Sequence, residues 1–297
     1  MRVSVMSQLS IWWEAARPKT LPAAAAPVIM GSAMAFHDGH LYLPAALAAL
    51  LGALLIQVGT NFANDYFDHQ KGADTGERLG PRRATQAGLV SPGQMKRAFS
   101  LAFAAAFVVG LYLIFRGGWP VLAIGVLSIL FGVLYTGGPY PLGYNGLGDI
   151  FVLIFFGPVA VGGTYYVQAL TVTPVVLAAG LAPGLISMAL LTINNLRDIS
   201  TDVKAGKRTL AVRFGERFAR MEYLVSIGAA ALVPFVLVYM TRENYFSVIA
   251  LFALIPALPG IKRVWHGEVG APLNLVLADT GKFLFLYSLM FSAGWIF

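Results

Sequence analysis

The sequence predicts an all-α polytopic membrane protein, with about nine transmembrane helices around a central cavity. Its 297 residues are 58% hydrophobic, and the mean hydropathy is +0.72. Charged residues make up 12% of the chain, about half of the share in a soluble domain. Apolar runs of about 20 residues, the length that crosses a bilayer, recur from end to end. We expect one membrane domain covering residues 1–297.

Each expected span is one of these apolar runs, in chain order. Several contain Gly and Pro, which membrane helices tolerate when neighbouring helices satisfy the freed backbone groups. The segment before the first span carries Arg2, Arg17 and Lys19 without a cleavage-site pattern, so we expect that span to remain in the protein. The spans are 20–37, 43–65, 95–115, 119–136, 148–168, 172–196, 221–240, 244–261 and 277–297.

The distribution of Lys and Arg orients these spans. With the N-terminus in the cytoplasm, the inner segments hold eighteen Lys and Arg and the outer segments hold two, Arg116 and Arg242. This bias is typical of membrane proteins, whose cytoplasmic loops are enriched in basic residues. We therefore expect a bacterial cytoplasmic (inner) membrane protein with its N-terminus in the cytoplasm and, after nine spans, its C-terminus outside.

The composition also excludes some classes of partner and site. A net charge of +7 alone would suit nucleic acid, but basic loops on one side of a membrane explain it better, so we expect no nucleic acid partner. The chain has no cysteine, which excludes disulfides and thiolate metal sites.

Two polar segments on the predicted cytoplasmic side carry the chemistry. The first is NFANDYFDHQKGAD, residues 61–74, at the end of the second span. Residues three and four apart share one face of a helix, so Asn61, Asp65 and Asp68 form a stripe. Asn194, Asp198 and Asp202 form a similar stripe at the end of the sixth span, and the two segments resemble a short internal repeat. Two such acidic stripes would repel each other unless a cation lay between them, and magnesium prefers such oxygen ligands together with substrate phosphates.

Basic residues follow both stripes. Arginine binds phosphate oxygens bidentately and lysine supplies a point charge, so these residues suit a diphosphate. The residues are Lys71, Arg78, Arg82, Arg83, Lys207 and Arg208. The alternative is that both segments are solvated loops whose Asp and Asn cap helices. A second alternative is a transporter, although its acids would lie near the middle of the membrane rather than at span ends.

Four segments, in order, resemble the UbiA superfamily of intramembrane aromatic prenyltransferases. They resemble most the branch that acts on 1,4-dihydroxy-2-naphthoate in menaquinone synthesis, and the loop at 135–149 lacks the basic pair of the ubiquinone branch. The segments are NFANDYFDHQKGADT, GPRRATQAGLVSP, YTGGPYPLGYNGLGD and NNLRDISTDVKAGKRTLAVRFG.

The resemblance implies transfer of a polyprenyl group from a polyprenyl diphosphate to 1,4-dihydroxy-2-naphthoate within the lipid bilayer. Diphosphate and the ring carboxylate would leave, and demethylmenaquinol would form. Another aromatic acceptor, 4-hydroxybenzoate or homogentisate, is the alternative. The resemblance also implies Mg2+ as cofactor. Its ligands would be Asn64, Asp65, Asp68, Asn194, Asp198 and Asp202, and the four aspartates among them would also be catalytic. The diphosphate ligands would be Lys71, Arg83, Lys207 and Arg208. Asp74 is a further metal candidate.

The acceptor ring is expected to contact Tyr135 and Tyr140 of the basic-free loop, together with Asp149 at the start of the fifth span. A helix start favours a carboxylate, so capping is the alternative role for Asp149. The cavity must exclude water from a carbocation. Aromatic side chains that would face this cation, or else simply pack, are Phe151, Phe155, Phe156, Tyr165 and Tyr166.

Overall fold

The computed structural model describes residues 7–73 and 79–297, which form helices and contain no strand. Eight helical segments are long and apolar enough to cross a bilayer, and one apolar helix, α5, is shorter. The segments are α1 with η1 and α2 (Gln8–Ala16, Pro18–Thr20, Leu21–His37), α3 (Leu43–Gln70), α4 (Pro92–Gly117), α5 (Trp119–Leu134), α6 with η3 and α7 (Gly148–Ile154, Phe155–Val159, Ala160–Ala169), α8 (Pro174–Lys204), α9 (Leu210–Thr241), η4 with α10 (Tyr245–Ala257, Leu258–Trp265) and α11 (Leu273–Ile296). The predicted all-α membrane fold is confirmed.

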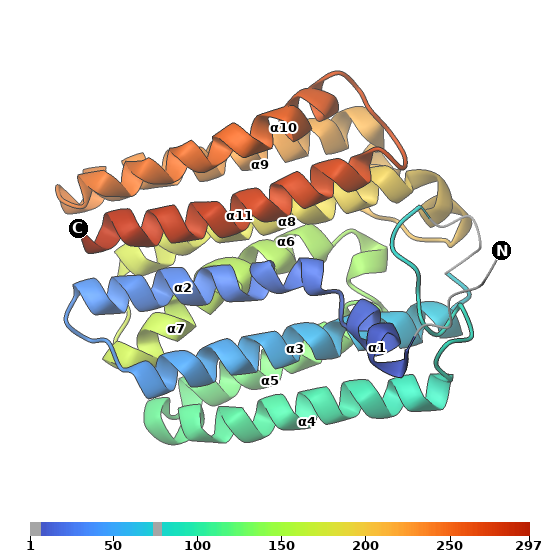
Figure 1. Ribbon diagram of the computed structural model, residues 1–297, viewed down its shortest axis with the longest axis horizontal. Helices are drawn as coiled ribbons and strands as arrows, with labels where there is room; N and C mark the ends of the chain where they lie inside the picture. Colours follow the sequence, from blue (N-terminus) through green and yellow to red (C-terminus); the bar gives the residue numbers. More distant parts are fainter. Residues whose placement is uncertain (1–6, 74–78) are drawn as a thin grey trace.

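Figure 1 shows the long helices side by side, with the chain crossing back and forth along one direction. This alternation brings the ends of α3, α5 and α8 together at the right-hand end, while the C-terminus lies at the opposite end. A short helix that the sequence analysis did not predict, α1 (Gln8–Ala16), lies at the same end as the polar segments. Its N-terminus is capped by the Ser7 hydroxyl, which accepts from the Ser10 amide.

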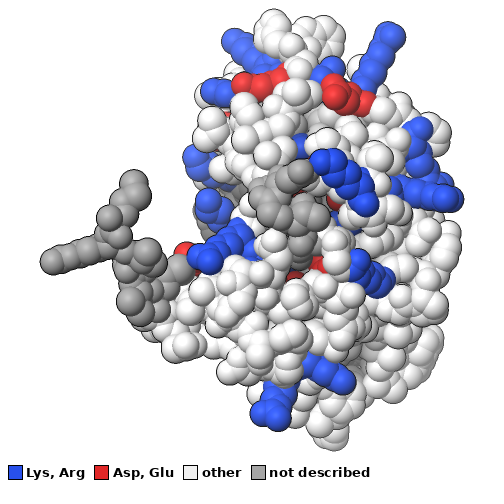
Figure 2. Space-filling model, turned by 90° about the vertical axis from the view of Figure 1, so that its right-hand side faces the viewer, with Lys and Arg blue, Asp and Glu red and all other residues white. Residues whose placement is uncertain are grey.

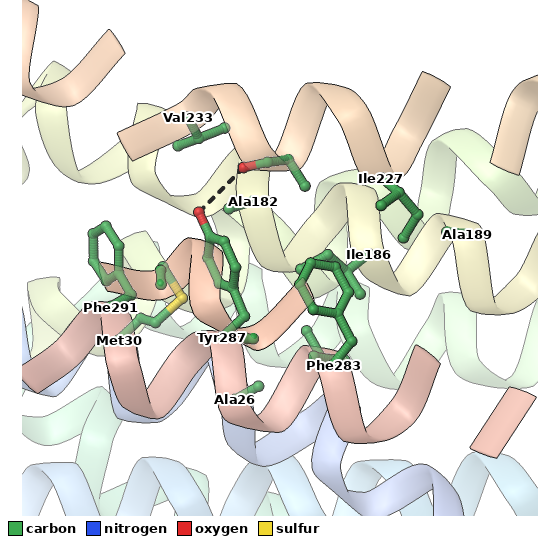
Figure 3. Close-up of a cluster of buried hydrophobic side chains, with 14 of the residues drawn as sticks. Ala26, Met30, Ala182, Ile186, Ala189, Ile227, Val233, Phe283, Tyr287 and Phe291 are labelled. Atoms are coloured by element: carbon green, nitrogen blue, oxygen red, sulfur yellow. Dashed lines mark hydrogen bonds between the residues drawn. The ribbon is translucent and has the colours of Figure 1, made fainter. Parts of the chain in front are cut away.

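The α2, α8, α9 and α11 helices form a closely packed apolar core (Figure 3). Small residues such as Ala26 and Ala182 let the helix backbones approach, and Phe283, Tyr287 and Phe291 fill the space between them. The Tyr287 hydroxyl donates to the Ala230 carbonyl at 3.1 Å, so even the one polar atom of this ring is satisfied. This half of the molecule forms a solid wall.

An apolar cavity of about 250 Å³ lies on the other side of that wall. Its lining comes from α2 to α7, and α8 to α11 contribute no lining residue in the described structure. The lining residues of this cavity therefore come from the first two thirds of the chain. It reaches Tyr135, directly after the last residue of α5, at the end of the molecule that carries the polar segments.

A break in the α6–α7 span shapes the cavity wall. Residues Phe155–Val159 form a π-helical turn with Pro158 inside it, and Gly157 has non-helical φ and ψ of −113° and −113°. The turn packs on α8 at Gly180 and Gly184, where the backbones meet without side chains between them. A π turn inserts an extra residue into the helix, and Phe155 and Phe156 line the cavity from it.

We expect Gly184→Ala to lower the stability of the protein by about 1–3 kcal/mol, because the added methyl group would overpack this contact. A Cβ at Gly184 would overlap the Leu153 carbonyl oxygen and lie 3.0 Å from the Gly157 Cα. Thermal unfolding in detergent measures the effect. Gly228→Ala on α9 is the control, since a Cβ there meets no atom within 4 Å. Equal melting temperatures for the two variants would contradict this account.

Candidate active site

Three acidic side chains from two distant parts of the chain meet at the cytoplasmic end predicted from the charges. Asp68 lies in the last turn of α3, and Asp198 and Asp202 lie in the last turns of α8. All three are buried, with 2%, 7% and 7% of their surfaces exposed. The Asp202 carboxylate interacts electrostatically with both Asp198 and Asp68. The structure therefore joins the two stripes, which are more than a hundred residues apart in the sequence.

Each of these carboxylates has a basic partner. Arg83 Nη2 lies 2.6 Å from Asp68 Oδ2, and Lys207 Nζ lies 3.2 Å from Asp202 Oδ1. Arg197 donates two hydrogen bonds to its neighbour Asp198, of 2.8 Å from Nε and 2.6 Å from Nη2. Buried charges need such pairing, because removing an ion from water is costly. Within the cluster, each negative group is therefore next to a positive group.

Tyr144 lies at the middle of this cluster. Its hydroxyl donates to Asp68 Oδ1 at 2.8 Å, and the ammonium groups of Lys71 and Lys207 lie 4.8 and 5.0 Å from the centre of its ring. The Lys71 ammonium also donates to the Thr136 carbonyl at 2.6 Å. Partial desolvation lowers the pKa of Lys71, and the Asp68 carboxylate opposes this shift. The Tyr144 ring therefore contacts both lysine ammonium groups while its hydroxyl binds the Asp68 carboxylate.

Asp65 has a different environment from Asp68. Its two carboxylate oxygens accept from the backbone amides of Ala84 and Thr85, at 2.9 and 3.1 Å. These bonds hold the loop after α3 against the helix and place Arg83, the preceding residue, beside Asp68. The sequence assigned Asp65 to the metal. In the structure each of its oxygens accepts one backbone amide, so Asp65 anchors the loop, and its assignment to the metal stays a prediction.

The asparagine side chains near the ends of α3 and α8 also form hydrogen bonds. Asn64 Oδ1 accepts from the Thr136 hydroxyl at 2.8 Å, and Asn194 Oδ1 accepts from Arg197 at 2.7 Å. Asn61 donates to the Ala16 carbonyl and the Thr20 hydroxyl, which fixes the junction of α1 and α2. Asn61 is thus structural, whereas Asn64 and Asn194 lie at the edge of the cluster.

Arg197 also connects the cluster to the loop after α3. Its Nη1 donates to Asn274 Oδ1 at 2.8 Å, and Asn274 donates in turn to the Leu79 carbonyl at 3.0 Å. Gly80 passes so close that an added Cβ would lie 2.6 Å from Arg197 Nη2. The start of α11, the end of α8 and this loop therefore close over one side of the site.

The family model described as the UbiA prenyltransferase family matches residues 24–289, which is most of the chain. This chain belongs to the UbiA prenyltransferase family. The 1,4-dihydroxy-2-naphthoate octaprenyltransferase of Haemophilus influenzae is 38% identical over 98% of this chain and 97% of its own length. The enzyme of the same name from Mycobacterium tuberculosis is 40% identical over 96% of each chain.

Solved structures of UbiA homologues have the same fold. A homologue from Archaeoglobus fulgidus bound to DMAPP and Mg2+ matches with a TM-score of 0.67 and 17% identity, over 96% of this chain and 98% of that one. A homologue from Aeropyrum pernix K1 matches with a TM-score of 0.70 and 17% identity, over 94% and 97%. The acidic ends of α3 and α8 thus belong to a UbiA fold.

Not every residue expected at this UbiA-type site joins the cluster. Arg208 is exposed, and its backbone amide donates to the Tyr144 carbonyl at 2.7 Å. Arg82 is also exposed. Tyr140 is 60% exposed and lies outside the cavity lining, so the structure does not bring it to an acceptor ring. Asp74 and Arg78 lie outside the described residues.

Tyr135 joins the cluster to the cavity. It lines the cavity and interacts electrostatically with Asp149, Asp68 and Asp202, so its hydroxyl faces the acids. Asp149 is 4% exposed in the first turn of α6. An acceptor held here would have the charged cluster on one side and the apolar cavity on the other.

The aromatic side chains expected to face the cavity divide into two groups, of which only the phenylalanines line it. Phe151 and Phe155 stack with their planes 9° apart, and the Phe131 ring lies 4.6 and 5.4 Å from them, so the three form one wall. Tyr165 and Tyr166 lie elsewhere: their hydroxyls donate to Asp38 and to the Gly117 carbonyl, at the end of the molecule remote from the cluster. Phe131 was missed because its helix offers many apolar residues and no distinguishing pattern.

Sequence reasoning also missed Tyr144 and Arg197. Tyr144 stands in the same short loop as Tyr135 and Tyr140, and its cluster position depends on the turn Gly143–Asn145. The signal for Arg197 was its place between Asn194 and Asp198, three residues from one and adjacent to the other. Space-filling Figure 2 looks onto this end and shows Lys and Arg spread across it.

We expect Asp65→Ala to release the loop after α3, because the Ala84 and Thr85 amides would lose their acceptor. Hydrogen exchange should then speed up at these two amides. Asp202→Asn is the control, since Asp202 pairs with Lys207 and makes no recorded bond to that loop. Unchanged exchange in Asp65→Ala would show that the loop is held by other contacts.

Proposed function

We propose that this UbiA-family protein transfers a polyprenyl group from a polyprenyl diphosphate to 1,4-dihydroxy-2-naphthoate, with loss of diphosphate and of the ring carboxylate, to give demethylmenaquinol in menaquinone biosynthesis. The observation that carries the proposal is the placement of a cluster of paired acids and bases at the mouth of an apolar cavity, with Tyr135 common to both. The names of the relatives that match nearly the whole chain support the acceptor.

The donor set fits magnesium. Within residues 7–73 and 79–297 no three His, Asp or Glu side chains lie close enough to hold one ion, so a closed protein cage is not present there. Magnesium is instead normally held by one or two carboxylates and completes its shell with water and phosphate oxygens. Asp68, Asp198 and Asp202 are the residues that would hold it, with Asn64 and Asn194 beside them. When bound, magnesium stabilises the negative charge of the departing diphosphate.

The basic residues bind the same diphosphate. Lys71, Lys207 and Arg83 surround Tyr144 and Asp68, so their charges converge on one place. Lys207 keeps 17% of its side chain exposed, which leaves it open to a ligand. These cations stabilise the charge that develops as the allylic carbon–oxygen bond breaks.

The cavity holds the prenyl chain and protects the cation. Its lining is apolar, and the wall of Phe131, Phe151 and Phe155 presents ring faces whose negative quadrupole favours a cation. Exclusion of water prevents capture of the cation as an alcohol. The electron-rich ring then attacks the cation from the Tyr135 side, next to the cluster.

The membrane placement follows from the charge bias and the helix directions. The alternating helices put the cluster and the loops rich in Lys and Arg at one end, and the C-terminus at the other. We propose that the cluster faces the cytoplasm, where the soluble acceptor arrives, and that the protein lies in the bacterial cytoplasmic membrane.

We expect Asp68→Asn and Asp198→Asn each to lower the prenyl transfer rate more than tenfold, a loss above about 1.4 kcal/mol. Each change removes a charge that would share the magnesium while keeping the shape of the side chain. Asp279→Asn is the control, because Asp279 is half-buried and pairs with the exposed Lys282 at 3.8 Å, away from the cluster acids. The assay uses purified protein, Mg2+, a polyprenyl diphosphate and 1,4-dihydroxy-2-naphthoate, with products identified by mass spectrometry. Full activity after chelation of Mg2+ would refute the metal assignment.

We expect Tyr135→Phe to raise the KM for 1,4-dihydroxy-2-naphthoate severalfold and to leave the KM for the polyprenyl diphosphate nearly unchanged. The hydroxyl lost would be the group that orients the ring. Tyr140→Phe is the matched control from the same loop, because Tyr140 is exposed outside the cavity. An effect on the diphosphate KM alone would move Tyr135 to the diphosphate pocket. Faster turnover of 4-hydroxybenzoate or homogentisate than of the naphthoate by the unaltered protein would refute the acceptor.

A further inference from the structure

Asp149 differs from the other acids near the site. Asp65 is bound by two backbone amides, and Asp68, Asp198 and Asp202 each face a basic side chain. Asp149 is 4% exposed, and its Oδ1 has no hydrogen-bond partner within the described residues. Burial of an unpartnered polar oxygen costs free energy, so such an atom in a native site calls for a function.

A second carboxyl group interacts with Asp149 through its charge. Glu222 of α9 interacts electrostatically with Asp149 and contacts the side chain of Thr192 on α8. The third titratable neighbour is Tyr135. Arg213 of α9 borders the same junction, but its Nη2 donates to the Asn145 carbonyl at 3.0 Å. Two buried or half-buried carboxyls that repel each other do not both ionise readily, and such a pair tends to share one proton.

Asp149 lies next to the place where the acceptor ring would be bound. Asp149 and Val152 are three residues apart and share one face of α6, and Val152 lines the cavity. The Tyr135 hydroxyl packs against the residue before Asp149: a Cβ added to Gly148 would lie 3.0 Å from that oxygen. Asp149 does not itself line the cavity; it lies next to the contact between Gly148 and the lining residue Tyr135, at the level of the charged cluster.

We propose that Asp149, coupled to Glu222, accepts the proton of the acceptor's ring hydroxyl during prenyl transfer and returns it after the carboxylate is lost. This inference rests on the proposed function. The carbon that bears the carboxylate uses a ring electron pair to bond to the prenyl cation, and the neighbouring C–OH becomes C=O as its proton passes to the Asp149 carboxylate. The carbon–carboxylate bond then breaks, CO2 leaves, and its electron pair gives a ring enolate that takes the same proton back. No other reactant is needed, and the proton is conserved.

A fixed carboxyl base contributes about 10²–10⁴-fold to such a step. We therefore expect Asp149→Asn to lower the single-turnover rate at least a hundredfold with 1,4-dihydroxy-2-naphthoate. The binding of Mg2+ with a non-hydrolysable prenyl diphosphate analogue, measured by calorimetry, should stay unchanged. Glu216→Gln, on an exposed turn of the helix that carries Glu222, is the control and should keep the full rate.

Glu222→Gln tests the coupling separately. The base must be unprotonated to act, so the rate of the unaltered protein falls as pH falls. Removal of the Glu222 charge makes Asp149 easier to ionise, and this acidic limb should move to lower pH, a change that a packing defect would not produce. This measurement stands even if Asp149→Asn does not fold.

The controls distinguish a failure of the proposed function from a failure of the proton-transfer role. An unaltered protein that fails to prenylate the naphthoate with Mg2+ refutes the proposed function. An active unaltered protein, together with an Asp149→Asn rate within threefold of it or an acidic limb that does not move in Glu222→Gln, refutes the proton-transfer role alone.

Discussion

The ion pair between Asp68 and Arg83 joins the last turn of α3 to the loop that follows it, and the charged end of the molecule is organised around this pair. Asp65 fixes the loop so that Arg83 meets Asp68, and Tyr144 completes the acid's shell from the opposite side. A buried pair of this kind adds little net stability, because desolvation offsets much of the attraction. Its value lies in holding charge of both signs, at low dielectric, in a fixed place.

The fold was predictable to a large extent, because lipid imposes the length and the polarity of each span. The convergence of Asp68 with Asp202 was also predictable from charge bias and topology alone. The partner of each acid was not. Helical periodicity put Asp65 and Asp68 on one face, but the loop returns to Asp65 through contacts with Ala84 and Thr85, nineteen and twenty residues further on. Helical periodicity identifies which residues share a face of the helix, whereas tertiary contacts decide which groups pack against that face.

In the short loop after α5, the sequence likewise did not predict where each side chain lies. It contains three tyrosines with no periodicity to distinguish them, and each has a different fate: Tyr135 reaches the cavity, Tyr140 faces outward and Tyr144 enters the charged cluster. The selection depends on turns at Gly138 and Gly146, whose φ angles of 75° and 73° favour glycine. Such backbone geometry leaves only a weak trace in the sequence.

The length of α5 has a consequence for the surrounding lipid. Its 16 residues rise about 24 Å, less than the hydrocarbon thickness of about 30 Å. Leu127 and Leu130 of this helix are exposed and do not line the cavity. The bilayer is therefore expected to thin beside α5, at a modest cost per ångström. A lipid that approaches from this side would find its headgroup lowered toward the level of the charged cluster, so the membrane itself would share in delivering the diphosphate.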